Sequence, residues 1–276
     1  MRGHLHLTVA RDPAASRSFI RQQSFRAPMH VGKGYWQDDA LLVHAVNSTA
    51  GLFAGDAVDW QVDVEPGARL RLVSPSATRV HRAAREDAPA VDPSPAQTDQ
   101  MFRVGVGGSL EVWPELFIPH AGCRYRQTTR IEIEPGGELL FCESLAPGRV
   151  ASGEAFAWES LQWATDIRYG HEPIARERWR MQPGVPGPDP LAGWRNALGV
   201  PAPYYATVFF VSEQLSEVDD RWQQIHDLQA DDTPADCQPL WIGVSRLRTV
   251  GWTIKILARD GAILRRALRQ IRNTLL

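Results

Sequence analysis

The sequence lacks several features that mark common classes of protein. Cysteines are few: the 276 residues include only Cys123, Cys142 and Cys237, and no two of them have the Cys-x-x-Cys spacing. An odd, scattered set does not suit a disulfide framework, a zinc ribbon or a redox pair, so we expect reduced thiols. A large excess of charge of one sign is absent too, because 30 basic residues are balanced by 32 acidic ones. No long-range field would therefore draw the whole chain to nucleic acid.

Long apolar runs are also absent. The stretch MRGHLHLTVARDP contains no apolar segment of the signal-peptide kind, and the most apolar run, around 205–211, is far shorter than the roughly 20 residues that span a bilayer. We therefore expect a soluble, cytoplasmic protein with no membrane partner. Familiar catalytic signatures are missing as well: there is no Gly-x-x-x-x-Gly-Lys phosphate loop, no Gly-x-Ser-x-Gly elbow and no His-Glu-x-x-His pair.

The first half of the chain contains one pattern three times: an alternating strand, a turn with glycine, and a second strand. The copies cover 58–72, 104–112 and 131–141. Alternation of apolar and polar residues indicates strands with one buried face. We interpret each copy as a hairpin that buries its apolar face only against its neighbours. The sequence thus predicts a mainly β fold of stacked antiparallel or solenoid-like sheets.

Two segments interrupt this pattern within what we expect to be a single domain of residues 1–276. Residues 83–100 contain three prolines and no large apolar side chain, which is typical of an exposed loop or an insertion. Residues 182–203 are richer still in proline and glycine and predict a long connection.

Helical spacing appears only toward the C-terminal end. One apolar stripe consists of Leu215, Val218, Trp222 and Ile225, and a second covers 263–271 with Asp260 as the expected N-cap. A pair of strands around 240–257 is expected between the two helices.

Three acidic residues stand at glycine-containing corners between predicted strands. The corners are Gly51-Leu52-Phe53-Ala54-Gly55-Asp56, Glu143 to Gly148-Arg149, and Gly153-Glu154. Glycine at such points permits a positive φ or a close backbone approach. Asp56, Glu143 and Glu154 either cap these turns and pair with Arg149, or they line a shared polar interior where carboxylates would meet a cation or a substrate.

Four motif segments occur in order along the chain. They are Ala-Gly-Leu-Phe-Ala-Gly-Asp at 50–56, Ala-Thr-Arg-Val-His-Arg at 77–82, Pro-Glu-Leu-Phe-Ile-Pro-His-Ala-Gly at 114–122, and a spaced set formed by Glu143, Gly148, Arg149, Ala151, Gly153 and Glu154. In this combination the chain resembles the urease accessory proteins of the UreD family, also called UreH. Each motif alone is weak, but the ordered set is specific and spans almost the whole chain.

The resemblance implies a β-rich, non-enzymatic scaffold that helps deliver nickel to apo-urease. It further implies a helical UreF-type partner that recruits a UreG-type GTPase, and a water-filled internal tunnel for Ni²⁺. Asp56, Glu143 and Glu154 match motif acids and are predicted to line this tunnel or its entrance, and Arg149 is predicted to hold its corner by pairing with an acid. No tightly bound cofactor is expected, because a path for an ion needs sites that release it.

The chain departs from the family pattern at four positions. Ala50 and Ala54 replace glycines, Arg79 replaces lysine and His81 replaces tyrosine. An alanine at a position that needs a positive φ costs on the order of 1 kcal/mol, so the corner is expected to be reshaped. His81 is either an additional nickel ligand or a histidine packed on a sheet.

Two other functions remain open from the sequence. An enzyme that acts on carbohydrate could use Asp56 with Glu143 or Glu154 as acid and base, which requires carboxyl groups roughly 5 to 9.5 Å apart in an open groove. A protein-binding module without metal passage would use none of these acids chemically.

Overall fold

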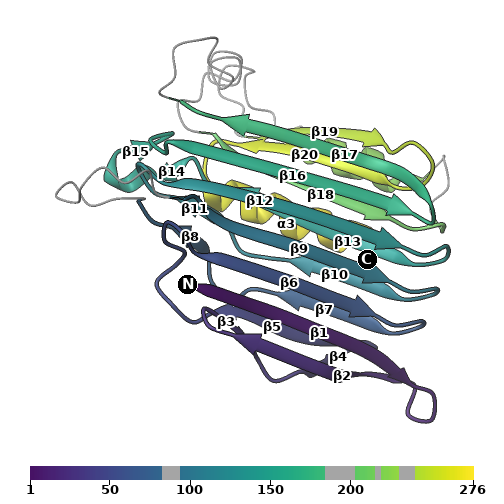
Figure 1. The fold of residues 1–276 in the computed structure, drawn as a ribbon. Coiled ribbons are helices and arrows are strands. Elements are labelled where there is room, and N and C mark those ends of the chain that lie inside the picture. Colours follow the sequence, from purple (N-terminus) through teal and green to yellow (C-terminus); the bar gives the residue numbers. More distant parts are fainter. Residues whose placement is uncertain (83–93, 184–202, 215–218, 230–239) are drawn as a thin grey trace.

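Two packed β-sheets form the body of the protein, with helices on one outer face (Figure 1). The computed structural model describes residues 1–82, 94–183, 203–214, 219–229 and 240–276. We call the seven-stranded sheet, which faces the viewer in Figure 1, the front sheet, and the eleven-stranded sheet the back sheet.

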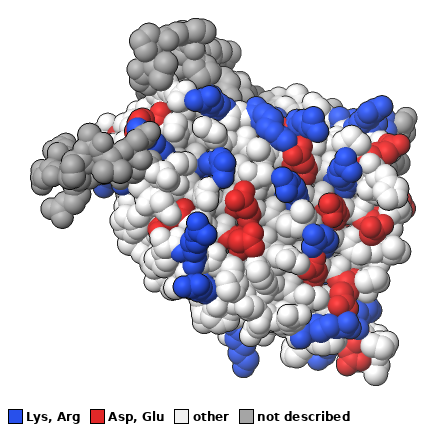
Figure 2. Space-filling model, viewed as in Figure 1, with Lys and Arg blue, Asp and Glu red and all other residues white. Residues whose placement is uncertain are grey.

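The front sheet has the strand order β17-β16-β12-β9-β6-β1-β2. Its strands are β1 (Arg2–Asp12), β2 (Arg17–Arg26), β6 (Ala57–Val64), β9 (Ala96–Val104), β12 (Arg124–Ile133), β16 (Ser160–Tyr169) and β17 (Glu172–Met181). Its outer face carries basic and acidic side chains side by side (Figure 2), as expected for the polar half of an alternating pattern.

The back sheet has the main strand order β19-β20-β18-β13-β10-β7-β5-β3, with β4, β8 and β11 attached. Its strands are β3 (Met29–Val31), β4 (Tyr35–Gln37), β5 (Ala40–Asn47), β7 (Arg69–Val73), β8 (Thr78–Val80), β10 (Ser109–Trp113), β11 (Phe117–Pro119), β13 (Glu138–Leu145), β18 (Tyr204–Val211), β19 (Leu240–Arg246) and β20 (Trp252–Ala258). A further pair, β14 (Gly148–Arg149) and β15 (Glu154–Ala155), flanks a short 3-10 turn at Val150–Ser152.

The three repeated units are not hairpins, because the two strands of each unit lie in different sheets. The turns after β6, β9 and β12 carry the chain from the front sheet to the back sheet, and Gly67, Gly107 and Gly136 adopt positive φ there. Equivalent strands of successive units then stack in parallel, β6 on β9 on β12 and β7 on β10 on β13. The solenoid-like stacking is therefore confirmed, whereas antiparallel pairs occur toward the sheet edges, such as β1 with β2 and β16 with β17.

The registers of these parallel strands align apolar residues across each sheet. In the front sheet Val62, Phe102, Ile131 and Ile167 are neighbours in consecutive strands, and all four are almost fully buried. In the back sheet an equivalent row consists of Leu41, Leu70, Leu110 and Leu139. The two rows belong to the main core, so burial of apolar surface between the sheets drives their packing.

A second core lies between the back sheet and helices α2 (Arg221–Asp227) and α3 (Gly261–Leu275). The first predicted helix is confirmed for Trp222 and Ile225, which are buried in α2, while Leu215 and Val218 lie outside the described residues. The second is confirmed as α3, which Asp260 caps by accepting hydrogen bonds from the amides of residues 262 and 263. The strand pair between the helices is present as β19 and β20. None of the helices in the described residues has the length and apolar character needed to span a bilayer.

The predicted loops fall partly outside the described residues. Residues 83–93 and 184–202 belong to that part, as does Cys237, while Cys123 and Cys142 are free and buried. The interpretation of 96–100 as loop was wrong, because these residues begin β9 and follow the alternating burial of a strand. Their small and polar side chains hid this alternation from the sequence.

Candidate functional site

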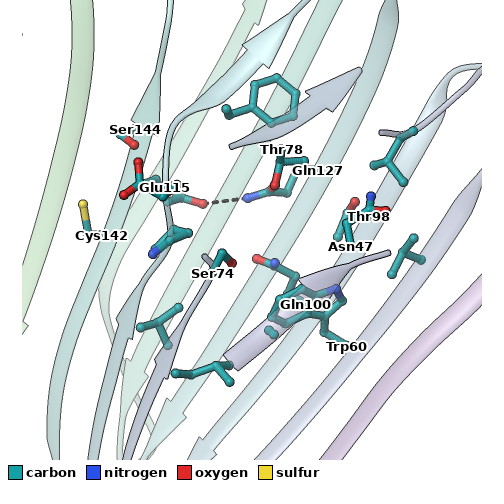
Figure 3. Close-up of a pocket in the computed structure, with 18 of the residues that line it drawn as sticks. Asn47, Trp60, Ser74, Thr78, Thr98, Gln100, Glu115, Gln127, Cys142 and Ser144 are labelled. Atoms are coloured by element: carbon teal, nitrogen blue, oxygen red, sulfur yellow. Dashed lines mark hydrogen bonds between the residues drawn. The ribbon is translucent and has the colours of Figure 1, made fainter. Parts of the chain in front are cut away.

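A cavity lies between the two sheets and is lined by side chains from both. The centres of water molecules can occupy about 100 Å³ of it, which is room for several waters, since one needs only about 10–15 Å³. Its polar lining comes mainly from the strands and the turns that follow them: Asn47, Ser74, Ser76, Thr78, Thr98, Gln100, Glu115, Gln127, Glu143 and Ser144. Figure 3 shows several of these side chains from opposite walls pointing into one space.

Glu143 is the carboxylate in the interior of this cavity. Glu143 lies on β13 at a position that faces the inter-sheet core, and it is only 8% exposed. One carboxylate oxygen accepts hydrogen bonds from Gln127 Nε2 and Trp163 Nε1, each at 2.7 Å, and the other accepts one from Thr165 Oγ1 at 3.1 Å. The bond from Gln127 is the dashed line in Figure 3. All three donors lie on the front sheet, so this carboxylate ties the two sheets together.

Burial is the main reason why the pKa of Glu143 rises from its ordinary 4.5 to about 7. The hydrogen bonds from Trp163 and Thr165 oppose this rise because they stabilise the charged form. Nearby charges act in both directions: Glu177 raises the pKa further and Lys255 lowers it. The carboxyl group therefore exchanges its proton close to neutral pH.

A chain of polar side chains leads from Glu143 across the front sheet. Tyr125 donates its hydroxyl hydrogen to Gln127 Oε1 at 2.9 Å, which fixes the amide so that its nitrogen faces Glu143. The Gln127 nitrogen also donates to Thr129 Oγ1 at 3.3 Å, and Thr129 donates to Gln100 Oε1 at 2.9 Å. These polar groups occupy inward-facing positions at which a purely apolar core would have hydrophobic side chains.

A second polar cluster lies on the opposite side of Glu143, toward β17 and β20. Lys255 forms an ion pair with Glu177, and both contact the Tyr205 hydroxyl at 3.1 Å. The strand registers explain its position, because Glu143 is a neighbour of Thr207 in β18, and Thr207 is a neighbour of Lys255 in β20. Sequence reasoning missed this cluster and the partners of Glu143.

Asp56 has a different environment and does not line the cavity. It is buried, and its carboxylate accepts a hydrogen bond from the amide of Phe53 at 2.8 Å and pairs with the amino group of Met1. The neighbouring Gly51 has a φ of +150°, and a Cβ there would lie 2.5 Å from the carbonyl oxygen of Arg79. Asp56 thus closes a tight corner whose glycine is sterically required.

Glu154 also lies outside the cavity lining, in a corner at the molecular surface. It forms a two-point ion pair with Arg149 and accepts the amide of Ala121 at 3.2 Å. Arg149 is the main reason why the pKa of Glu154 falls below its ordinary value. Gly148 and Gly153 adopt positive φ in this corner, and a Cβ at Gly148 would lie 2.1 Å from the carbonyl oxygen of Glu154.

His81 packs among aromatic rings on the outside of the same region. Its ring stacks on Phe53 and meets His120 edge to face, with centroid distances of 4.5 Å in both cases, and its Nε2 lies 3.1 Å from the carbonyl oxygen of Ala50. Burial, together with the neighbouring His81, lowers the pKa of His120. Across the described residues, no group of three or more His, Cys, Asp or Glu side chains is placed to hold a metal ion.

The structure therefore separates the three motif acids that the sequence grouped together. Glu143 lines the cavity, Asp56 closes the corner before β6, and Glu154 pairs with Arg149 at the surface. The missed residues carried one usable signal: Gln127, Thr129 and Thr165 occupy positions that the period-2 pattern assigns to the buried face. A polar residue at such a position needs a partner or a cavity.

Comparison with known proteins agrees with the motifs. The chain matches the family described as "UreD urease accessory protein" over residues 1–276. It is 38% identical to the urease accessory protein UreD of Opitutus terrae, over 99% of this chain and 93% of that protein. Proteins of the same name from Herpetosiphon aurantiacus and Acetivibrio thermocellus are 31% and 24% identical, over 67% and 94% of this chain and 62% and 92% of theirs. The chain therefore belongs to the UreD family of urease accessory proteins.

Proposed function

We propose that this chain is a non-enzymatic scaffold of urease maturation that passes Ni²⁺ through the inter-sheet cavity toward apo-urease. The observation that supports this most directly is a buried carboxylate, Glu143, in a polar cavity with room for water. Family membership supports the link to urease. In this proposal the chain works in the cytoplasm with a UreF-type helical protein and, through it, a UreG-type GTPase.

The cavity provides oxygen ligands for a cation but does not surround the cation with negative charges. A carboxylate with amide and hydroxyl groups lowers the cost of taking a divalent ion out of bulk water. Nickel binds oxygen ligands less tightly than thiolate or imidazole sets, so a single interior carboxylate favours release over storage. The ion would displace the proton that Glu143 holds near neutral pH, which couples its entry to proton release.

The test is co-expression of the chain with apo-urease and the accessory partners, followed by purification of the assembly. Urease activity and urease-bound nickel are measured for the wild type, Glu143→Gln and Glu154→Gln. Glu154→Gln is the matched control, because it neutralises a motif acid outside the cavity lining. We expect Glu143→Gln to assemble normally and to lower both readouts, while Glu154→Gln retains them.

Two results would point elsewhere. Full activation by an assembled Glu143→Gln chain would indicate a protein-binding module that does not conduct metal. Assembly failure with a correctly folded wild-type chain would remove the scaffold role itself. Two observations disfavour carbohydrate hydrolysis. Only Glu143 of the three motif acids lines the cavity, so the pair of carboxyl groups is missing there. The relatives of the chain are named as accessory proteins.

A further inference from the structure

The cavity contacts both faces of strand β13. Phe141 and Glu143 face the inter-sheet core, whereas Cys142 belongs to the core beneath α3, on the outer face of the back sheet. Ser144 has the same strand parity as Cys142, and successive side chains of a strand point to opposite faces. Residues 141–144 all line the cavity, so it extends along β13 and touches residues that belong to both faces of this strand.

The strand pairing shows why the back sheet is open at this point. β10 pairs with β13 up to the register of Val112 with Phe141, and β11 resumes the pairing only where Phe117 meets Leu145. Residues 142–144 therefore have a strand neighbour on the β18 side and none in the β10 or β11 ladder. The interrupted ladder lies directly beside Glu143.

The back sheet contributes several further polar residues to the cavity lining. Ser74 and Ser76 follow β7, Glu115 follows β10, and Ser144 lies on β13. Figure 3 shows Glu115, Cys142 and Ser144 together on one side of the cavity. Cys142 does not supply a thiolate there, because burial strongly raises its pKa.

Glu115 is the carboxylate at the outer rim. Its side chain is 42% exposed, and Oε2 lies 3.5 Å from Nε of Arg265 on α3, whose side chain is more exposed still. A long, solvated ion pair of this kind contributes little stability, so a divalent cation or a docking partner can separate it at small cost. Arg265 thus forms only a weak ion pair with the Glu115 carboxylate, which remains available to another cation.

We propose that this interruption of the back sheet is the mouth of the cavity, and that Glu115 is the first carboxylate that a divalent transition-metal ion meets there, with Arg265 as a displaceable counter-ion. The inference rests on the proposed passage of Ni²⁺ and adds to it the face of entry or exit and the residue that controls it. The ion passes from Glu115 by the hydroxyls of Ser74 and Ser144 to Glu143.

The experiment measures the rate of urease activation, and of nickel incorporation into urease, in the assembled complex at limiting and at saturating Ni²⁺. Glu115→Gln removes the rim charge and Glu115→Arg reverses it; both changes suit a partly exposed site. Glu159→Gln is the matched control, because Glu159 is an exposed carboxylate paired with Arg124 of the front sheet and does not line this cavity.

At limiting Ni²⁺ we expect Glu115→Gln to slow both rates roughly fivefold to tenfold, the scale of a lost attraction between a unit charge and a divalent ion near the surface. Glu115→Arg should slow them more, Arg265→Gln should leave them equal or faster, and saturating Ni²⁺ should restore Glu115→Gln. Added salt should narrow these differences, because the charges are solvated.

The outcomes separate this inference from the function on which it rests. Wild-type rates for Glu115→Gln and Glu115→Arg, together with slow rates for Glu143→Gln, would overturn the mouth and leave the conduction proposal standing. Wild-type rates for all three assembled variants would overturn both. A Glu115→Gln defect that persists unchanged at saturating Ni²⁺ would also refute recruitment at the rim.

Discussion

Replacing Glu143 by glutamine should stabilise the protein above neutral pH, even though it removes a motif carboxylate. The pKa of this group is raised from 4.5 to about 7, chiefly by burial. Below pH 4.5 the acid is neutral in the folded and unfolded chains and affects stability little. Between these two pKa values the unfolded chain has lost the proton that the folded chain keeps, so stability falls as pH rises. At about 1.4 kcal/mol per pH unit, the full penalty reaches about 3 kcal/mol above pH 7.

Glutamine fits the hydrogen bonds around this position. Its amide oxygen can take the place of the carboxylate oxygen that accepts from Gln127 and Trp163. Its amide nitrogen then faces Thr165, whose hydroxyl can rotate from donor to acceptor. The variant therefore keeps its partners while losing the buried charge, so the stability difference reports the charge rather than a broken network.

The assay is urea unfolding of the wild type and Glu143→Gln between pH 4.5 and 8.5. We expect nearly equal stabilities at the acidic end and an advantage for the variant that grows to about 3 kcal/mol by pH 8. Groups that titrate in both proteins cancel in the difference. Parallel stability curves across this range would refute the claim that the folded protein holds a proton on Glu143 near neutrality.

Glu154→Gln provides a control of opposite sign. Arg149 lowers the pKa of Glu154, so this ion pair stabilises the folded chain above the ordinary pKa of a glutamate and loses that contribution on acidification. Because the pair lies at the surface, the loss in Glu154→Gln should stay below about 1 kcal/mol at neutral pH. A stabilising effect of this control would show that the Glu143 result is not specific to burial.

Two further predictions follow from neighbouring residues. Lys255→Met should raise the pKa of Glu143 above about 7, because the ammonium lowers it in the wild type; carboxyl-carbon NMR titration measures this, and an unchanged titration would contradict the assigned coupling. Gly51→Ala should cost more stability than Gly55→Ala, on the order of 3 against 1 kcal/mol in urea unfolding, because both glycines have positive φ but only a Cβ at Gly51 collides with backbone. Equal losses would mean that φ alone limits both positions.

The sequence could predict the stacking of the sheets but not the path of the chain through them. Alternation at 58–72 has the same form whether the second strand folds back in its own sheet or crosses to another. The glycine turn does not decide between these paths, because Gly67 permits the sharp corner in either case. Only the packing of successive units, in which β7 meets β10 and not β6, selects the crossover.

The candidate site was partly predictable for a similar reason. Glu143 could be singled out because its motif places an acid near a corner, and its inward position follows from the parity of Phe141 in the same strand. The separation of Asp56 and Glu154 from Glu143 depends on how the three corners are arranged in space. A local sequence pattern does not encode that arrangement. The opening beside β13 depends on two neighbouring strands ending short of each other, and strand ends are set by tertiary contacts as much as by residue preference.

The departures from the family pattern gather around one corner and lie outside the cavity lining. Ala50 and Ala54 do not adopt positive φ, whereas Gly51 and Gly55 do, so the expected reshaping of this corner by alanine is not needed. His81 packs on Phe53 and His120, and its Nε2 lies beside the carbonyl oxygen of Ala50, so the imidazole is held by its surroundings. Since none of these residues lines the cavity, the corner can vary in composition while Leu52 and Thr78, which do line it, keep their places. The motif segments therefore contain residues of both kinds, because Leu52, Thr78, Glu115 and Glu143 line the cavity, whereas Asp56, His81 and Glu154 do not.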